Sequence, residues 1–304
     1  MSPPDHIDLA AYLARIGFAG APAPDLATLE GLHLAHLGRI PFENLDVRLG
    51  RPVSLDLDAL QAKLVTGRRG GYCFEQNTLF AAVLRSIGFT VETLEARVRP
   101  AGGDASTPRT HMLLRAEVDG RAWLADVGFG ADGPLLPVPL DGEPSVQPGG
   151  TYRVEQRPDG TLILRVLRDG SPRSLYGFKT VPALAVDFEV ANHFTSTHPL
   201  SPFVRTLTVQ RSTPESRHIL RGRGYTVRQP GDETVREVAD ASLPDLLRTA
   251  FLLDVPDEDA ARAWGSREQP LCPSCRRPSP HRVDRPLAPG NDPRSAPQGL
   301  GSPS

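Results

Sequence analysis

The feature that most constrains the fold of this chain is the dipeptide Asp119-Gly120, which separates two apolar, partly alternating runs. Asp-Gly is a preferred sequence for the two-residue turn of a β-hairpin. If these residues form the turn, Val118 pairs with Arg121 and the numbers of paired residues sum to 239. The sequence therefore predicts an antiparallel hairpin of defined register, and the register assigns every side chain to one face.

This register places a histidine and an aspartate on the same face of the hairpin. His111 falls opposite Gly128, which leaves room beside the imidazole ring. Asp126, two residues before Gly128, is then the diagonal neighbour of His111. Diagonal positions lie about 7–8 Å apart, close enough for a carboxylate to reach an imidazole. A one-residue slip would separate the two side chains, so the predicted pair depends on the position of the turn.

A cysteine stands where a glycine-bearing turn leads into a predicted helix. After Cys73, apolar residues recur at i, i+3, i+4 and i+7 before the stop signal of Gly88, and they are Phe80, Val83, Leu84 and Ile87. Unpaired backbone N–H groups and the helix dipole at a helix N-terminus favour a thiolate over a thiol. The pattern indicates a reactive cysteine, although free cysteines are also among the most buried residue types.

These three side chains form a complete nucleophilic relay: a cysteine nucleophile, a histidine that accepts its proton, and an aspartate that holds the tautomer of the histidine. Each residue also has an ordinary structural role, as a buried thiol, a hydrogen-bonded core histidine or a polar residue at a strand end. Because a cysteine at a helix start rarely coincides with a face-matched His/Asp pair, we predict that Cys73, His111 and Asp126 are catalytic.

Secondary-structure patterns divide the 304 residues into regions. Up to about residue 88 the patterns are helical, since Asp25 can cap a helix and residues 55–65 are amphipathic. From residue 89 to about 190 strand and turn signals follow. Beyond about residue 195 we expect two strands and a helix, at residues 206–210, 225–227 and 242–253. The sequence thus predicts an α+β fold, with Cys73 in one region and the His/Asp pair in the next.

Several ordered blocks of the sequence resemble the bacterial type of the arylamine N-acetyltransferase family. The resemblance covers roughly residues 5 to 265 and rests on residues 40–46, 69–77, 110–111, 126–130, 195–199 and 201–203. It implies an N-terminal helical bundle, a central antiparallel β-barrel and a C-terminal α/β lid, with a cysteine-protease-like Cys-His-Asp arrangement. Combined with the patterns above, it predicts these three parts over residues 1–88, 89–194 and 195–265.

The resemblance also implies a ping-pong reaction that moves acetyl from acetyl-CoA, through a thioester on Cys73, to an arylamine, arylhydrazine or N-hydroxyarylamine. His111 would be the base and Asp126 its orienter. The residues that match the acceptor pocket of the family are Phe42, Phe129 and Phe203, and those near its CoA approach are Thr107, Thr110 and Gly130. Plain core packing is the other interpretation of each phenylalanine. Glu43 and Arg69 either brace the site or form a surface or loop ion pair.

Three other functions use similar residues. An amide synthase that releases a polyketide chain by intramolecular attack of an aryl amine resembles the family in the same blocks, so the catalytic residues do not separate the two. A cysteine peptidase or transglutaminase shares the chemistry, but the matches at Phe42, Phe129 and Phe203 argue against it. The complete set of Cys, His and Asp argues against a ligand-binding homologue with an idle site.

Composition excludes several classes of protein. The formal net charge of −2 does not indicate the basic surface that is typical of nucleic-acid-binding proteins. No apolar stretch approaches the length of a membrane span, and the N-terminus lacks the pattern of a secretory signal. Three cysteines, with Cys73 expected to be unpaired, fit a reducing cytoplasm. We therefore expect a cytoplasmic enzyme, while its physiological acceptor, acyl donor and oligomeric state stay open.

The last segment, residues 266–304, is rich in Pro, Arg and Ser, and we expect it to be largely disordered. Within it, Cys272 and Cys275 resemble half of a zinc site, with His281 as a third ligand. A structural zinc site needs four protein ligands, so we expect no metal here. A redox-labile pair of cysteines is the next interpretation.

Overall fold

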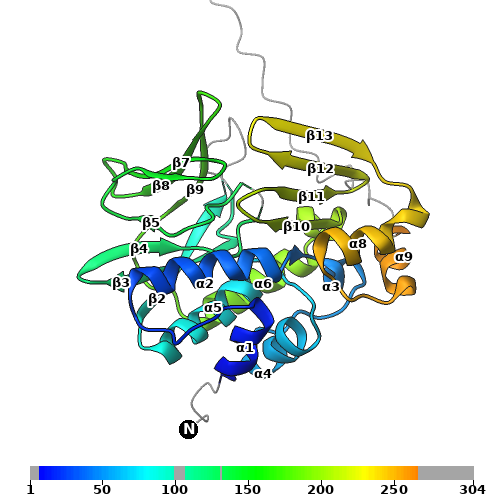
Figure 1. Cartoon of the computed structure of the whole chain (residues 1–304), viewed down its shortest axis with the longest axis horizontal. Helices are drawn as coiled ribbons and strands as arrows, with labels where there is room; N and C mark the ends of the chain where they lie inside the picture. The colour runs from blue at the N-terminus through cyan, green and yellow to red at the C-terminus, as the bar shows by residue number, and fades with distance from the viewer. Residues whose placement is uncertain (1–6, 99–106, 131, 266–304) are drawn as a thin grey trace, which may run out of the picture. The chain divides into compact units, whose positions relative to one another are not determined.

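The structure is a computed structural model that describes residues 7–98, 107–130 and 132–265. These residues combine helices with two antiparallel sheets (Figure 1). The predictions for residues 266–304, including Cys272, Cys275 and His281, lie outside the described part. Within the described residues, none of the helices has both the length and the apolar character needed to cross a membrane.

Helices come before the barrel in the chain, as the sequence predicts. They are α1 (Leu9–Ile16), α2 (Leu26–Arg39), α3 (Leu45–Arg48), α4 (Leu57–Leu60) and α5 (Cys73–Ile87). Asp25 caps α2, because its side chain accepts the backbone N–H of Thr28 at 2.8 Å. Gly88 ends α5 in the left-handed region, with φ of 111°. The expected amphipathic helix differs in one respect: residues 61–66 continue α4 as a π-helical turn, and in it Lys63 reaches two carboxylates.

Eight antiparallel strands form a nearly closed barrel in the order β5-β4-β3-β2-β9-β8-β7-β6. Their bounds are β2 Thr90–Val98, β3 His111–Val118, β4 Arg121–Ala125, β5 Val138–Pro139, β6 Ser145–Gln147, β7 Gly150–Gln156, β8 Leu162–Arg168 and β9 Ser171–Phe178. The β3–β4 hairpin has the predicted register, in which Val118 pairs with Arg121. Asp119 and Gly120 both have positive φ, 51° and 74°, as a type I′ turn requires.

A second sheet has five antiparallel strands in the order β1-β10-β11-β12-β13. Their bounds are β1 Phe42–Glu43, β10 Thr208–Ser212, β11 Arg217–Arg221, β12 Gly224–Gln229 and β13 Asp232–Glu237. The strands expected at 206–210 and 225–227 correspond to β10 and β12, whereas β11 and β13 were not predicted. Because β1 pairs with β10, this sheet ties the N-terminal region to the C-terminal one.

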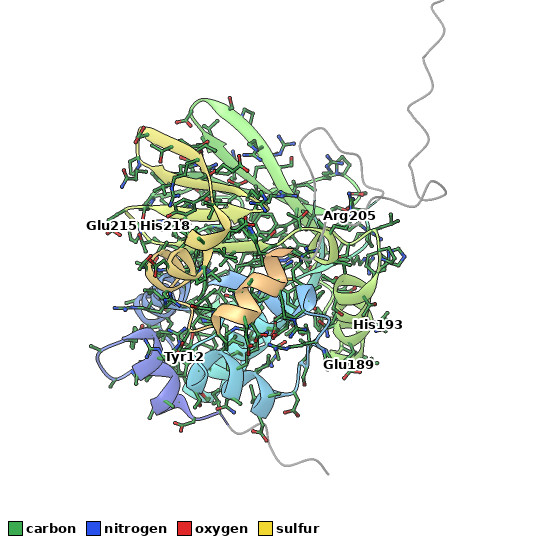
Figure 2. All side chains as sticks on the ribbon, turned by 90° about the vertical axis from the view of Figure 1, so that its right-hand side faces the viewer. Tyr12, Glu189, His193, Arg205, Glu215 and His218 are labelled. Carbon is green, nitrogen blue, oxygen red and sulfur yellow. The ribbon has the colours of Figure 1, made fainter. Side chains whose placement is uncertain are left out.

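Four further helices are α6 (Ala185–Thr197), α7 (Pro202–Arg205), α8 (Leu243–Phe251) and α9 (Asp257–Gly265). The expected helix over 242–253 is α8. The helix α6 begins inside the region where strands were expected. Its start carries a local signal, because the carboxylate of Asp187 accepts the backbone N–H of Leu184 at 2.9 Å. The exposed side chains of Glu189 and His193 mark the outer face of α6 in Figure 2.

Three clusters of buried apolar side chains make up the core. One joins the helices to the β3–β4 hairpin and contains Cys73 together with Phe80. A second, with Tyr152 and Tyr176, belongs to the barrel strands. The third packs α8 on the five-stranded sheet. Cys73 therefore lies where the helices meet the barrel.

Candidate active site

Cys73 is the first residue of α5, as the sequence predicts. It is 4% exposed, and its thiol donates to the carbonyl of Thr110 with an Sγ···O distance of 3.6 Å. The turn before it requires glycine, because a Cβ at Gly70 would lie 2.0 Å from the carbonyl oxygen of Pro41. This turn and the helix start hold the thiol against the beginning of β3.

His111 and Asp126 contact one another, as the hairpin register predicts. The distance from His111 Nε2 to Asp126 Oδ2 is 2.7 Å, and both side chains are buried. Burial disfavours the charged form of each group, but their mutual attraction outweighs it, so the pKa of His111 rises to about 10 and that of Asp126 falls. The nearby Cys73 side chain adds to the rise in the pKa of His111. Since Nε2 is bonded to Asp126, Nδ1 is the ring nitrogen that remains for another partner.

Four donors hold the Asp126 carboxylate. Its Oδ2 accepts from His111 and from the hydroxyl of Tyr176 at 2.8 Å. Its Oδ1 accepts from Asn77 Nδ2 at 3.0 Å and from the backbone N–H of Gly128 at 2.9 Å. A carboxylate that accepts several hydrogen bonds is favoured in its ionised form.

Sequence reasoning missed both side chains that join His111 in holding Asp126. Asn77 could have been found, because it lies one helical turn after Cys73 and so shares its face of α5. Tyr176 comes from β9, and no turn or periodic pattern links it to the hairpin.

Gly128 permits a close approach between the barrel and α5. A Cβ at this position would lie 2.6 Å from the Cα of Cys73 and 2.7 Å from Nδ2 of Asn77. The sequence predicted that the missing side chain leaves room beside the imidazole ring. The nearest neighbours are instead the backbone of Cys73 and the amide of Asn77, so the glycine lets the loop after β4 pack directly on the start of α5.

The three predicted phenylalanines lie in two places around the triad. The Phe129 ring packs on His111, with a centroid distance of 5.2 Å. Phe42 and Phe203 form a separate pair with a centroid distance of 5.6 Å. Phe203 also contacts the ring of Tyr72, the residue before Cys73, at 5.9 Å. Aromatic surface therefore adjoins both the histidine and the cysteine ends of the site.

The residues expected near CoA have different surroundings. Thr110 contacts the nucleophile through its carbonyl group. The hydroxyl of Thr107 donates to the carbonyl of Val98 at 2.8 Å. Gly130 has φ of 93°, and a Cβ there would overlap the side-chain oxygen of Gln210. Thr110 thus adjoins Cys73, and contact of all three residues with CoA stays a prediction.

The ion pair of Glu43 and Arg69 is buried, so it is not a surface pair, and its bracing of the active site stays a prediction. Arg69 Nη2 lies 2.7 Å from Glu43 Oε1, and the Glu43 side chain has no exposed surface. The other oxygen of Glu43 accepts the backbone N–H of Leu45 at 2.6 Å. The pair therefore fixes the segment of β1 next to the glycine turn.

Glu75 ties the Cys73 turn to the same charged network. One of its oxygens accepts the backbone N–H of Tyr72 at 3.0 Å. The other lies 2.6 Å from Lys63 Nζ, which is also 2.6 Å from Asp46. Burial raises the pKa of Glu75 to about 7 against the opposing effect of Lys63. Within the described residues, no group of His, Cys, Asp and Glu side chains is arranged to hold a metal ion.

Comparison with known proteins gives consistent matches over most of the chain. A family model described as N-acetyltransferase matches residues 25–260. The arylamine N-acetyltransferase of Mycolicibacterium smegmatis is 42% identical over 259 residues, which cover 83% of this chain and 94% of that protein. The arylamine N-acetyltransferase / N-hydroxyarylamine O-acetyltransferase of Salmonella typhimurium is 37% identical over 253 residues, covering 82% and 90%.

Solved structures share the fold as well. The Mycobacterium marinum arylamine N-acetyltransferase, solved in complex with CoA, superposes with a TM-score of 0.80 at 33% identity. The superposition covers 86% of this chain and 100% of that one. The match therefore includes the helices, the barrel and the five-stranded sheet described above.

Proposed function

The chain belongs to the arylamine N-acetyltransferase family, and we propose that it moves acetyl from acetyl-CoA to an aryl amine through a thioester on Cys73. Its family makes it an acyltransferase. The observation that carries the thioester step is the buried His111–Asp126 pair next to Cys73, which stands at a helix N-terminus with its thiol on the carbonyl of Thr110, the residue before His111. This is the arrangement that activates a thiol for attack on a carbonyl carbon.

In the first half-reaction His111 takes the proton of Cys73, and the thiolate attacks the acetyl carbon of acetyl-CoA. The bond from Sγ to the acetyl carbon forms, the bond from that carbon to the sulfur of CoA breaks, and the departing sulfur takes the proton from His111. The raised pKa of His111 favours the imidazolium that pairs with the thiolate. Asp126 holds the ring so that Nδ1 faces the sulfur.

In the second half-reaction the amine attacks the thioester carbon. The carbon–nitrogen bond forms, the carbon–Sγ bond breaks, and the amine proton passes through His111 back to Cys73. Burial of Cys73, which is 4% exposed as a residue, limits the access of water to the intermediate. The thioester on Cys73 therefore hydrolyses slowly and persists until an amine binds.

We assign the acceptor to the aromatic surface around the triad. Phe129 beside His111 offers one ring face, and the pair of Phe42 and Phe203 offers a second. Offset or edge-to-face contact with such rings suits an aryl group. The proposed acceptors are arylamines, arylhydrazines and N-hydroxyarylamines, and the name of the Salmonella relative includes the first and third of these classes.

The remaining assignments follow from the family. CoA as product and acetyl-CoA as co-substrate are supported by the CoA complex of the M. marinum relative. We place CoA beside Thr107, Thr110 and Gly130, with Thr110 nearest to the sulfur. We further propose a cytoplasmic enzyme in three parts, a helical bundle, a barrel and an α/β lid, over residues 1–88, 89–194 and 195–265.

The proposed reaction is tested by weighing the intact chain after incubation with acetyl-CoA and no amine. We expect one added acetyl group, which disappears when an aniline is added and never forms on the Cys73→Ser variant. Alkylation with iodoacetamide, measured on the peptide that contains Cys73 because the chain also has Cys272 and Cys275, shows in parallel whether this thiol is reactive. If acetyl-CoA gives no acetyl adduct although iodoacetamide alkylates the thiol in the parallel sample, acetyl-CoA is not the donor. That result would favour the longer acyl donors of a polyketide amide synthase.

A further inference from the structure

One histidine that the proposed reaction does not use contacts the segment that carries Asp126. The ring of His33, on α2, has no exposed surface. Its Nε2 accepts the backbone N–H of Asp126 at 3.1 Å, and its Nδ1 donates to the carbonyl of Leu135 at 2.9 Å. A backbone N–H can only donate, which settles the tautomer of the ring. His33 therefore ties together two points of the loop that follows β4.

A second histidine, His36, is tied to the other half of the site. The amide nitrogen of Gln76 donates to the carbonyl of Gly71 at 2.6 Å, so its oxygen faces His36. His36 Nε2 donates to that oxygen at 3.1 Å, and Nδ1 accepts from the hydroxyl of Tyr12 at 2.8 Å. Through Gln76 the ring holds the glycine turn that leads into Cys73.

Both histidines lie on one face of α2, three residues apart. Their rings pack edge-on against the same ring of Phe80 on α5, with centroid distances of 6.0 Å for His33 and 5.5 Å for His36. A single helix thus contacts the loop that carries Asp126 and the turn that carries Cys73. In Figure 1, α2 runs as one unbroken helix beside the barrel.

We propose that His33 and His36 are positioning residues, which set the separation between Cys73 and the His111–Asp126 pair. This proposal rests on the proposed function, because it concerns the same reacting groups. Hydrogen bonds from one rigid helix to two separate segments fix their distance better than contacts between the segments alone. Small displacements of reacting groups have large effects on rate.

Both rings are neutral in this role. Burial lowers the pKa of His33 to about 4 and that of His36 to about 3, so neither is charged at neutral pH. Their contacts require the neutral form, since one nitrogen of each ring accepts a hydrogen bond. The two residues therefore act through geometry and add no charge beside the triad.

Amide side chains separate the two contacts of His33. In His33→Gln the terminal amide reaches the place of Nε2, where its oxygen accepts the N–H of Asp126. In His33→Asn the amide stands at the place of Nδ1, where it donates to Leu135 and leaves Asp126 unsupported. Each variant loses one buried hydrogen bond, so a merely structural role would lower the stability of both by similar amounts.

The first readout is the single-turnover rate at which acetyl-CoA acetylates Cys73, measured with the melting temperature. We expect the rate of His33→Asn to be about tenfold or more below that of His33→Gln, at similar melting temperatures. Equal rates in the two variants, or rates that simply follow the melting temperatures, would overturn the proposal.

The second readout does not depend on acetyl transfer. The rate of alkylation of Cys73 by iodoacetamide, followed across pH, reports the pairing of the thiol with His111. We expect His33→Asn to change this profile and His33→Gln to preserve that of the wild type. If the wild type takes no acetyl group, the proposed function fails, while this profile still decides the positioning role: unchanged profiles in both variants would overturn it.

A second pair of variants decides the matter if the His33 variants do not fold. His36→Gln keeps the donor to Gln76, whereas His36→Asn keeps only the acceptor for Tyr12. We expect His36→Gln to acetylate Cys73 about tenfold faster than His36→Asn. Equal rates in this pair would overturn the proposal.

The matched control is His218→Gln. His218 is a partly buried histidine on β11 that bonds to Ser216 and Tyr225. Figure 2 shows it on the five-stranded sheet, apart from Tyr12 among the N-terminal helices. The control should acetylate at the rate of the wild type. A loss as large as that of His33→Asn would overturn the proposal, because the loss of any histidine would then suffice.

Discussion

Replacing Gly128 by alanine should separate the triad without unfolding the chain. The φ of Gly128 lies outside the left-handed region, so alanine meets no backbone strain there. Its methyl group would stand 2.6 Å from the Cα of Cys73, whereas ordinary contact begins at 3.4 Å. The loop or the start of α5 must therefore move by about 0.8 Å, the difference between these two distances. A displacement near 1 Å can lower a rate about 100-fold, which is the loss that we expect in Cys73 acetylation.

The cost in stability should be much smaller than a loss of fold. Overpacking of a core typically costs about 1–3 kcal/mol, which lowers the melting temperature of a domain of this size by roughly 2–12 °C. Thermal unfolding is followed by circular dichroism, and acetylation by intact mass in single turnovers at 25 °C. A variant that is folded at that temperature yet slow to acetylate would agree with displacement of the nucleophile.

Gly224→Ala is the control for this experiment. Gly224 is the first residue of β12. The nearest atom to a Cβ at this position would be the carbonyl oxygen of Arg221, at 3.6 Å. That is an ordinary contact, so rate and melting temperature should match those of the wild type. A Gly128→Ala rate within about threefold of the wild type would refute the steric argument, because the methyl group would then displace no reacting atom.

Three other experiments test the electrostatics of the site. Asp126→Asn should keep the fold and lower the acetylation rate about 10²- to 10⁴-fold, since the amide no longer holds the required tautomer of His111; a rate near that of the wild type in single turnovers would contradict this. The pKa of His111 is about 10 in the folded chain and about 6.5 when unfolded. The contribution of His111 protonation to the free energy of unfolding is therefore complete below about pH 6.5. This contribution decreases by up to about 1.4 kcal/mol per pH unit as the pH rises from there, and it is lost above about pH 10. The difference in unfolding free energy between wild type and His111→Gln should shrink over that window, and a constant difference would count against the raised pKa. Lys63→Met should cost about 3–5 kcal/mol in urea unfolding, because it leaves the buried Glu75 carboxylate without its cation while Asp46 keeps Arg69; Lys63→Met/Glu75→Gln should recover part of the loss, and no recovery would show that the Glu75 charge is not the cause.

The parts of this site that the sequence predicts are those fixed by a turn or by a helical period. Asp119-Gly120 sets the register of one hairpin, and the register brings Asp126 to His111. The apolar period after Cys73 places that residue at or near the start of a helix, and it is the first residue of α5. Both inferences need only residues close in the chain, because hairpin register and helix phase are local properties.

Hairpin register and helix phase do not predict the side chains that reach the site from elements distant in the chain. Tyr176 meets Asp126 because β2 pairs with both β3 and β9, which places β9 in the barrel with only β2 between it and β3. His33 meets the same residue because α2 packs beside the loop after β4. In the sequence, Tyr176 and His33 look like any other core tyrosine or histidine. A single hydrogen-bonding side chain belongs to no repeating pattern that would reveal its partner.

The same limit applies to the charged network behind the nucleophile. Glu43 and Arg69 stand in separate blocks, and their pairing could be predicted as either surface or buried until the position of β1 was known. The β1 strand is only two residues long, and it forms by pairing with β10 from the far end of the chain. A homologue that kept the motif residues but lost these distant partners would keep the sequence signature and lose the fixed geometry. The motif therefore predicts the reacting groups, whereas the residues that hold them in place follow from the closed fold.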